Sequence, residues 1–141
     1  MMRQTGLVAV LMLLCLSCVK SGDVIPNVAV NFQGTLVNPA LSKLQAPGGA
    51  VIIPGYGVAG IIIYHELSQT NGTYVAYDAC STYMPQKKCA VQLDNNSVTV
   101  TDPCSGAKFS LTDGNPVKAP ATIALKSYSV NTDGFNIFVS N

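Results

Sequence analysis

The stretch DPCSGAKF at residues 102–109 and its shorter counterpart YDACST at residues 77–82 decide the fold of this chain. Each places a cysteine among small, turn-forming residues directly after a strand-like apolar run. Cysteine and aspartate are metal-ligating residue types. The single histidine of the chain, His65, lies outside both segments. The two segments therefore look like a metal site that lacks most of its usual ligands.

Short runs rich in valine, isoleucine and tyrosine surround these segments and predict an all-β domain. The alternation of Val28, Val30 and Phe32 with other residues predicts a half-buried first strand. The three isoleucines at residues 61–63 are apolar on both faces and predict a central strand. Strands are predicted at residues 50–54, 61–67, 73–78, 90–93, 98–102, 108–111, 123–130 and 135–140, with turns at 70–72, 95–96, 112–115 and 131–134.

Two other local patterns carry predictions. Asn38-Pro39 followed by Leu41 and Leu44 predicts a capped helical turn, the only helix expected. The glycines of residues 55–60 match a phosphate-binding pattern only superficially, because no helix follows them. We expect a flexible loop there, with Tyr56 exposed.

The cysteine segments resemble the cluster loops of Rieske iron–sulfur domains, which read Cys-x-His and Cys-Pro-x-His-Gly-x-x-Phe. Pro103, Gly106 and Phe109 fit the second motif without a gap. The resemblance covers residues 28–141 and implies a Rieske-like antiparallel β-sandwich with a small inserted subdomain of the cluster-binding type. The chain looks especially like a group of small bacterial Rieske-like lipoproteins, whose mature ends also read Val-Ile-Pro before the first strand, as residues 24–26 do here.

The four positions that correspond to cluster ligands are degenerate: they read Cys80, Thr82, Asp102 and Ser105. A Rieske cluster needs two thiolates on one iron and two imidazoles on the other. We therefore expect no cofactor, with a 2Fe-2S cluster as the alternative. A zinc site built from Cys80, Asp102 and Cys104 is disfavoured as well, because a disulfide would leave too few thiolates.

The cysteines of the domain favour one disulfide and one leftover thiol if the protein is exported to an oxidising compartment. The resemblance implies a bond between Cys89 and Cys104, which occupy the positions of the family's bridge between the two loops. The alternative is Cys80 with Cys104.

Catalytic groupings are scarce, because neighbouring His65 and Glu66 point to opposite faces of a strand and hydroxyl nucleophiles have no second histidine as a base.

The N-terminus predicts export. Arg3 precedes an apolar run at residues 7–16, which is too short to span a bilayer. The run ends in Ser17-Cys18, which resembles a lipoprotein cleavage site with Cys18 as the acylated residue. We expect a signal peptide at residues 1–17, a tether at 18–27 and the domain at 28–141. The alternative is an ordinary signal peptide cut near Ser21 or Gly22.

Charge excludes another class of function. Eight lysines and arginines balance seven acids, with no basic stripe, so nucleic acid is not an expected partner.

The hypothesis is a lipid-anchored envelope domain on the periplasmic face of the outer membrane, without its cluster, with a binding or structural role and no expected enzymatic activity. Its candidate docking tip, for an envelope protein, is Tyr83, Met84 and Pro85. The alternatives are a Rieske-type 2Fe-2S electron-transfer protein, with oxidoreductase-type activity, and a thiol–disulfide redox sensor.

Overall fold

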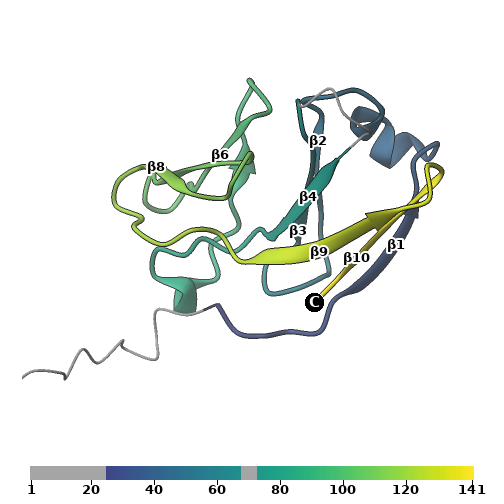
Figure 1. The fold of residues 1–141 in the computed structure, drawn as a ribbon. Helices are drawn as coiled ribbons and strands as arrows, with labels where there is room; N and C mark the ends of the chain where they lie inside the picture. The colour runs from purple at the N-terminus through teal and green to yellow at the C-terminus, as the bar shows by residue number, and fades with distance from the viewer. Residues whose placement is uncertain (1–24, 68–72) are drawn as a thin grey trace, which may run out of the picture.

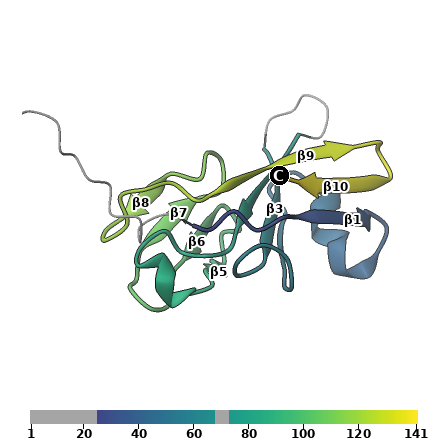
Figure 2. The same cartoon turned by 90° about the horizontal axis from the view of Figure 1, so that it is seen from below.

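The computed structural model describes residues 25–67 and 73–141, which form two antiparallel sheets. The larger sheet has the strand order β1-β10-β9-β4-β3-β2 and the smaller one the order β5-β6-β7-β8. Both views show the small sheet at one end of the molecule and the helical turn η1 at the other (Figures 1 and 2). The elements are β1 (Asn31–Thr35), η1 (Pro39–Gln45), β2 (Ala50–Ile53), β3 (Ile61–His65), β4 (Tyr74–Asp78), η2 (Pro85–Lys87), β5 (Gln92–Leu93), β6 (Thr99–Thr101), β7 (Lys108–Ser110), β8 (Pro116–Lys118), β9 (Ser127–Thr132) and β10 (Asn136–Ser140).

The small sheet is an insertion between β4 and β9, two strands that pair directly in the large sheet. This arrangement confirms the all-β fold with a small inserted subdomain. Strand β3 shows how one sheet serves two cores. Ile61 and Ile63 belong to the cluster that includes Leu44 of η1, whereas Ile62 packs in the second cluster with residues of the small sheet such as Phe109. All three isoleucines are fully buried, as a central strand requires.

The helical turn at η1 forms as its sequence predicts. The Asn38 side chain accepts a hydrogen bond from the Ala40 amide at 2.9 Å, and proline follows at the first helical position. Leu41 and Leu44 are buried beneath it. The turn therefore closes one end of the core of the large sheet.

Several expectations about local structure were wrong. The first strand, β1, begins at Asn31, and Val28 lies before it and is exposed. A second helical turn, η2, begins at Pro85, and three residues are too few for a periodic signal. Strand β8 was not predicted, because two of its three residues are exposed and it pairs only with β7. Strand β9 begins at Ser127, later than expected, because residues before it bond to loops: the Ile123 carbonyl accepts from the Thr82 hydroxyl at 2.6 Å, and the Leu125 amide donates to the Gly114 carbonyl at 2.9 Å.

The N-terminal predictions fall mostly outside the described residues. The signal peptide, Cys18 and the tether up to residue 24 are not described, and neither is the turn at 70–72. From Ile25, which is buried, the chain is fixed to the domain. Lys126 donates hydrogen bonds to Pro26 and Asn27. Within the described ranges, no helix has the length and apolar character to span a bilayer.

Candidate functional site

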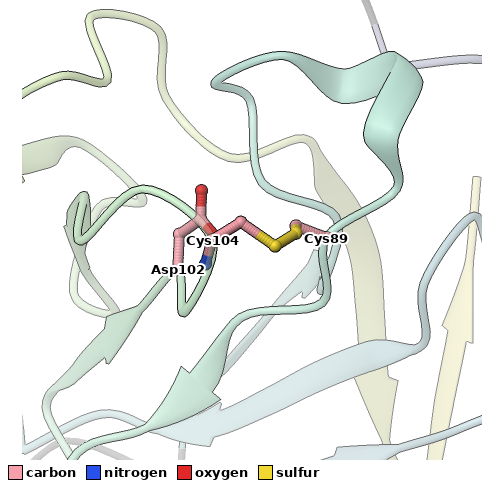
Figure 3. A group of neighbouring side chains, drawn as sticks. All are labelled: Cys89, Asp102 and Cys104. Carbon is pink, nitrogen blue, oxygen red and sulfur yellow. A yellow bond between two sulfur atoms is a disulfide. The ribbon is translucent and has the colours of Figure 1, made fainter.

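Two loops of the inserted subdomain meet at the candidate site. The first, residues 79–91, follows β4, and the second, residues 102–107, joins β6 to β7. A disulfide between Cys89 and Cys104 links them, with the two Cα atoms 6.4 Å apart (Figure 3). This is the pairing that the family resemblance implied. The alternative pairing of Cys80 with Cys104 was wrong, since Cys80 is a buried free thiol.

Asp102 is the polar centre of the two loops and is fully buried. Its carboxylate accepts hydrogen bonds from the Ser81 hydroxyl at 2.8 Å, the Ser105 hydroxyl at 2.6 Å and the Cys104 amide at 2.8 Å. Burial acts to raise the pKa of Asp102, but the hydrogen bonds from Ser105, Ser81 and Cys104 outweigh it and lower the pKa below its usual value. Asp102 therefore stays ionised and bonds both loops through one carboxylate.

A second buried carboxylate, Asp78, holds the start of the first loop. It accepts hydrogen bonds from the Val58 amide at 2.7 Å, the Ala59 amide at 3.2 Å and the Cys80 amide at 2.8 Å, and from the hydroxyl of Tyr128 at 2.7 Å. Burial and the bond to Asp78 raise the pKa of Tyr128. Sequence reasoning did not identify Asp78 as an organising residue. The one available signal was an acid at the end of an apolar strand, directly before the cysteine segment.

The glycine-rich residues 55–60 supply the amides that Asp78 binds. Gly57 has φ +62°, and a Cβ added there would meet the Asp78 carboxylate and lie 2.7 Å from the Tyr128 hydroxyl. Tyr56 is half-buried and packs edge-on against Phe32, with ring centroids 5.2 Å apart. The expectation of a flexible loop with an exposed tyrosine was therefore wrong. The Val58 and Ala59 amides of this segment are bonded to the protein's own carboxylate.

The two remaining ligand positions, Cys80 and Thr82, are also occupied by internal contacts. The Cys80 sulfur lies 3.6 Å from the Ser81 carbonyl and 3.8 Å from the Pro85 carbonyl. Burial, with the carboxylates of Asp78 and Asp102 nearby, raises the pKa of the Cys80 thiol to about 11. The Thr82 hydroxyl donates to the Ile123 carbonyl at 2.6 Å. Both side chains therefore stabilise the first loop in the present structure.

His65 lies away from both loops. Strand pairing places Ile61 opposite Asp78 and His65 opposite Tyr74, so His65 is about 13 Å along β3 from the start of the first loop. Its Nδ1 lies 2.8 Å from the Leu44 carbonyl, and its ring packs against Tyr74. The histidine belongs to the packing around η1.

The tip of the first loop is only partly exposed. Tyr83 is 37% exposed, Met84 is half-buried and Pro85 is buried. Tyr83 and Met84 line a small pocket beside the disulfide, with a volume of about 20 Å³. Of the three predicted docking residues, Tyr83 and Met84 reach the surface, whereas Pro85 was predicted wrongly, because it is buried and cannot contact a partner directly.

Comparison with known proteins identifies the fold. No protein-family model and no curated sequence matches this chain. Among solved structures, the cyanobacterial plasma membrane Rieske protein PetC3 from Synechocystis PCC 6803 matches with 24% identity and a TM-score of 0.57, over 82% of this chain and 100% of that one. The chain has a Rieske-like fold. A chain of the complex of reduced oxygenase and oxidised ferredoxin in carbazole 1,9a-dioxygenase also matches, with 19% identity and a TM-score of 0.50, over 79% of this chain and 93% of that one.

The donor set of this Rieske-like domain does not fit a Rieske cluster. The four corresponding positions offer a thiol, a hydroxyl, a carboxylate and a hydroxyl, where the cluster requires two thiolates and two imidazoles. The structure instead brings Cys89, Asp102 and Cys104 together, with a ligand-type atom from each within 4.8 Å of the others. This group differs from the trio of Cys80, Asp102 and Cys104 that was considered from the sequence, because it contains Cys89 in place of Cys80. Its sulfur and that of Cys104 are bonded to each other here.

Proposed function

We propose that this protein is a Rieske-like domain of the cell envelope that functions without an iron–sulfur cluster, in a binding or structural role. The observation that carries the proposal is the buried Asp102 carboxylate at a cluster-ligand position. It accepts hydrogen bonds from two serine hydroxyls, Ser81 in the first loop and Ser105 in the second, where a Rieske cluster would need an imidazole or thiolate ligand.

The two loops of this domain have links that do not depend on a cofactor. The Cys89–Cys104 disulfide is a covalent link. The hydrogen bond from the Ser81 hydroxyl to the Asp102 carboxylate, at 2.8 Å, is a polar link between the loops. The bond from the Ser81 amide to the Cys89 carbonyl, at 2.8 Å, closes the first loop on itself. No buried side-chain nitrogen or oxygen among the described residues is left without a hydrogen-bond partner. These links support a loop pair that keeps its shape as a cofactor-free surface.

The docking role is proposed for the exposed part of the tip. Tyr83 is aromatic and partly exposed, and aromatic residues and methionine are enriched at protein interfaces. Ile123, 48% exposed, follows the first loop closely because its carbonyl accepts the Thr82 bond. Tyr83, Met84 and Ile123 together would give an envelope protein an apolar contact area beside the disulfide.

The envelope location is proposed from the sequence of the first 18 residues. The charged start, the apolar run and the Ser17-Cys18 pair favour lipidation of Cys18 and attachment to the periplasmic face of the outer membrane. Metabolic labelling with a fatty-acid analogue tests this proposal. Label in the wild type that disappears in Cys18→Ala supports the anchor, whereas an unlabelled wild-type protein contradicts it.

A thiol–disulfide sensor remains the second candidate, because one observation favours it. Cys104 is exposed and Cys89 is half-buried, so a thiol reagent can reach the bond. Titration of the bond in dithiol redox buffers tests this role. A midpoint near the potential of the compartment favours a sensor, and a much lower midpoint favours a structural bond.

Two experiments test the main proposal. Protein extracted anaerobically from cells, without a metal-affinity step, is analysed for iron and acid-labile sulfide; a folded, iron-free protein supports the proposal, and near-stoichiometric iron overturns it. A photo-crosslinking residue at position 83 in intact cells, compared with the same residue at exposed Val117 on β8, tests the docking role. Discrete adducts at position 83 alone support it, and equal yields at both positions contradict it.

A further inference from the structure

Cys89, Asp102 and Cys104 form a compact group of potential ligands at the junction of the two loops (Figure 3). One ligand-type atom of each residue lies within 4.8 Å of the other two. The same three residues line the 20 Å³ pocket, together with Tyr83, Met84 and Ser105. Both sulfur atoms are committed to the disulfide in this structure, so the group can bind a metal only after that bond is reduced.

We propose that reduction of the Cys89–Cys104 disulfide converts this group into a binding site for one Zn²⁺ ion. The ligands are the two thiolates and one oxygen of the Asp102 carboxylate, with a water molecule in the fourth tetrahedral position. This set of donors matches the sulfur and oxygen ligands that zinc accepts in proteins. The proposal goes beyond the cofactor-free role, because it concerns a second, redox-dependent state of the same loops.

The chemistry of the conversion balances. A dithiol reductant transfers two electrons and two protons to the disulfide, which gives two protein thiols, and the reductant becomes a disulfide. Zn²⁺ then displaces the two thiol protons, and the two thiolates with the carboxylate leave the site with a net charge of −1. Lys87 also lines the pocket and is a cation that can offset that charge.

The geometry requires only a small rearrangement of the loops. Zinc–sulfur bonds of about 2.3 Å in a tetrahedral site place the two sulfurs about 3.8 Å apart. The two Cα atoms are 6.4 Å apart, which is in the upper part of the range for disulfides. After reduction, rotation of the two cysteine side chains can therefore provide much of the increase in the distance between the sulfurs. The 20 Å³ pocket has room for about one water molecule at the fourth position.

Asp102 is already oriented for this role. The Ser81 and Ser105 hydroxyls both bond its Oδ2 atom, while the Cys104 amide bonds Oδ1. Such bonds act as the outer shell that orients a carboxylate ligand in metal sites. Cys80 lies outside the group and is left over. Two thiolates and one carboxylate, without an imidazole, favour a mononuclear zinc site over a Rieske cluster.

Cobalt titration of the reduced protein tests the proposal, with Co²⁺ as a spectroscopic stand-in for Zn²⁺. The mature protein is taken from the cell envelope, reduced with a dithiol and freed of reductant under anaerobic conditions. We expect one Co²⁺ per chain, a thiolate-to-metal charge-transfer band, and loss of that band when one equivalent of Zn²⁺ is added. The oxidised protein is expected to show no such band.

Matched variants separate this site from the other thiols. Cys80→Ala keeps the three ligands and should retain the band, whereas Cys89→Ser should lose it. Asp102→Asn should weaken binding at least about tenfold, because loss of an outer-shell partner alone typically costs about 10–100-fold. Ser105→Ala removes one hydroxyl that orients Asp102 and should weaken metal binding by about 10–100-fold. This variant replaces Asp102→Asn in the test if Asp102→Asn does not fold. A reduced wild type without the band, or wild-type affinity in folded Asp102→Asn or Ser105→Ala, overturns the proposal. Either result leaves the iron measurement of the cofactor-free proposal unaffected.

Discussion

Replacement of Asp102 by alanine should strongly destabilise the domain. Alanine removes the acceptor of three hydrogen bonds at a fully buried position. The Ser81 hydroxyl is itself buried and loses its acceptor, whereas Ser105 is half-buried and Cys104 is exposed, so water can replace the acceptor that their donors lose. The perturbation therefore loosens both loops while it leaves the disulfide and the two sheets in place.

The size of the effect follows from these contacts. A hydrogen bond to a charged group contributes about 1.5–3 kcal/mol, and an unpaired buried polar group costs about 1–3 kcal/mol. Because two of the three donors regain water, we expect a net loss of about 3 kcal/mol in the free energy of unfolding. With an m-value of about 1.5 kcal/mol per molar urea, the unfolding midpoint falls by about 2 M.

Urea unfolding followed by circular dichroism measures this loss, with Asp133→Ala as the control. The Asp133 carboxylate also accepts three hydrogen bonds, but it lies in an exposed hairpin turn. The control should therefore shift the midpoint far less. Equal shifts in the two variants, or no shift in Asp102→Ala, would refute the argument that burial makes the Asp102 bonds strong.

The stability of the wild type should also depend on pH through Asp102. Its folded-state pKa is lowered relative to the unfolded chain, since hydrogen bonds outweigh the effect of burial. The stabilisation is therefore fully present above the unfolded pKa of about 3.9 and is lost as the pH falls through the lower folded-state value. Asp102→Asn lacks this contribution, so the difference in the free energy of unfolding between wild type and variant should become smaller below about pH 4. A difference in the free energy of unfolding that stays constant from pH 6 to pH 2 contradicts the lowered pKa of Asp102.

Three further predictions concern the surrounding contacts. Cys89→Ser should cost about 3 kcal/mol, since the disulfide closes a span of 15 residues, and reductant should no longer change its urea midpoint; an unchanged stability speaks against a structural bond. Gly57→Ala should destabilise more than Gly55→Ala by thermal unfolding, because both have positive φ but only the first adds a Cβ that meets Asp78; equal losses would remove the clash argument. Cys80 should resist alkylation at pH 8 in the folded protein, since a pKa of about 11 leaves about 0.1% thiolate; rapid labelling by mass-spectrometric mapping contradicts its burial.

The sequence predicted those parts of the fold that local patterns determine. Three successive isoleucines required a strand buried on both faces, and Asn38-Pro39 required a capped turn. The inserted subdomain and the disulfide partner came from the family resemblance, because the spacing of three cysteines leaves more than one pairing open. Strand β8 escaped prediction, since it is short, mostly exposed and defined only by its pairing with β7.

The candidate site was harder to predict than the fold. Asp102 was identified by its place in a motif, but the motif says nothing about Ser81, whose hydroxyl reaches it from 21 residues away. Asp78 was missed, because its partners Val58 and Ala59 belong to a loop that only the folded sheet brings beside it. The burial of Pro85 likewise depends on how the first loop folds back. Tertiary contacts of this kind leave no periodic signal in the sequence.

The most direct test of the central claim is the intact mass of the mature protein under native, anaerobic conditions. A cluster-free domain with one interloop disulfide should have the mass of its polypeptide and any attached lipid, less two hydrogens, and peptide mapping should join Cys89 to Cys104. A mass that includes two iron and two sulfide atoms, lost only on denaturation, would contradict the account.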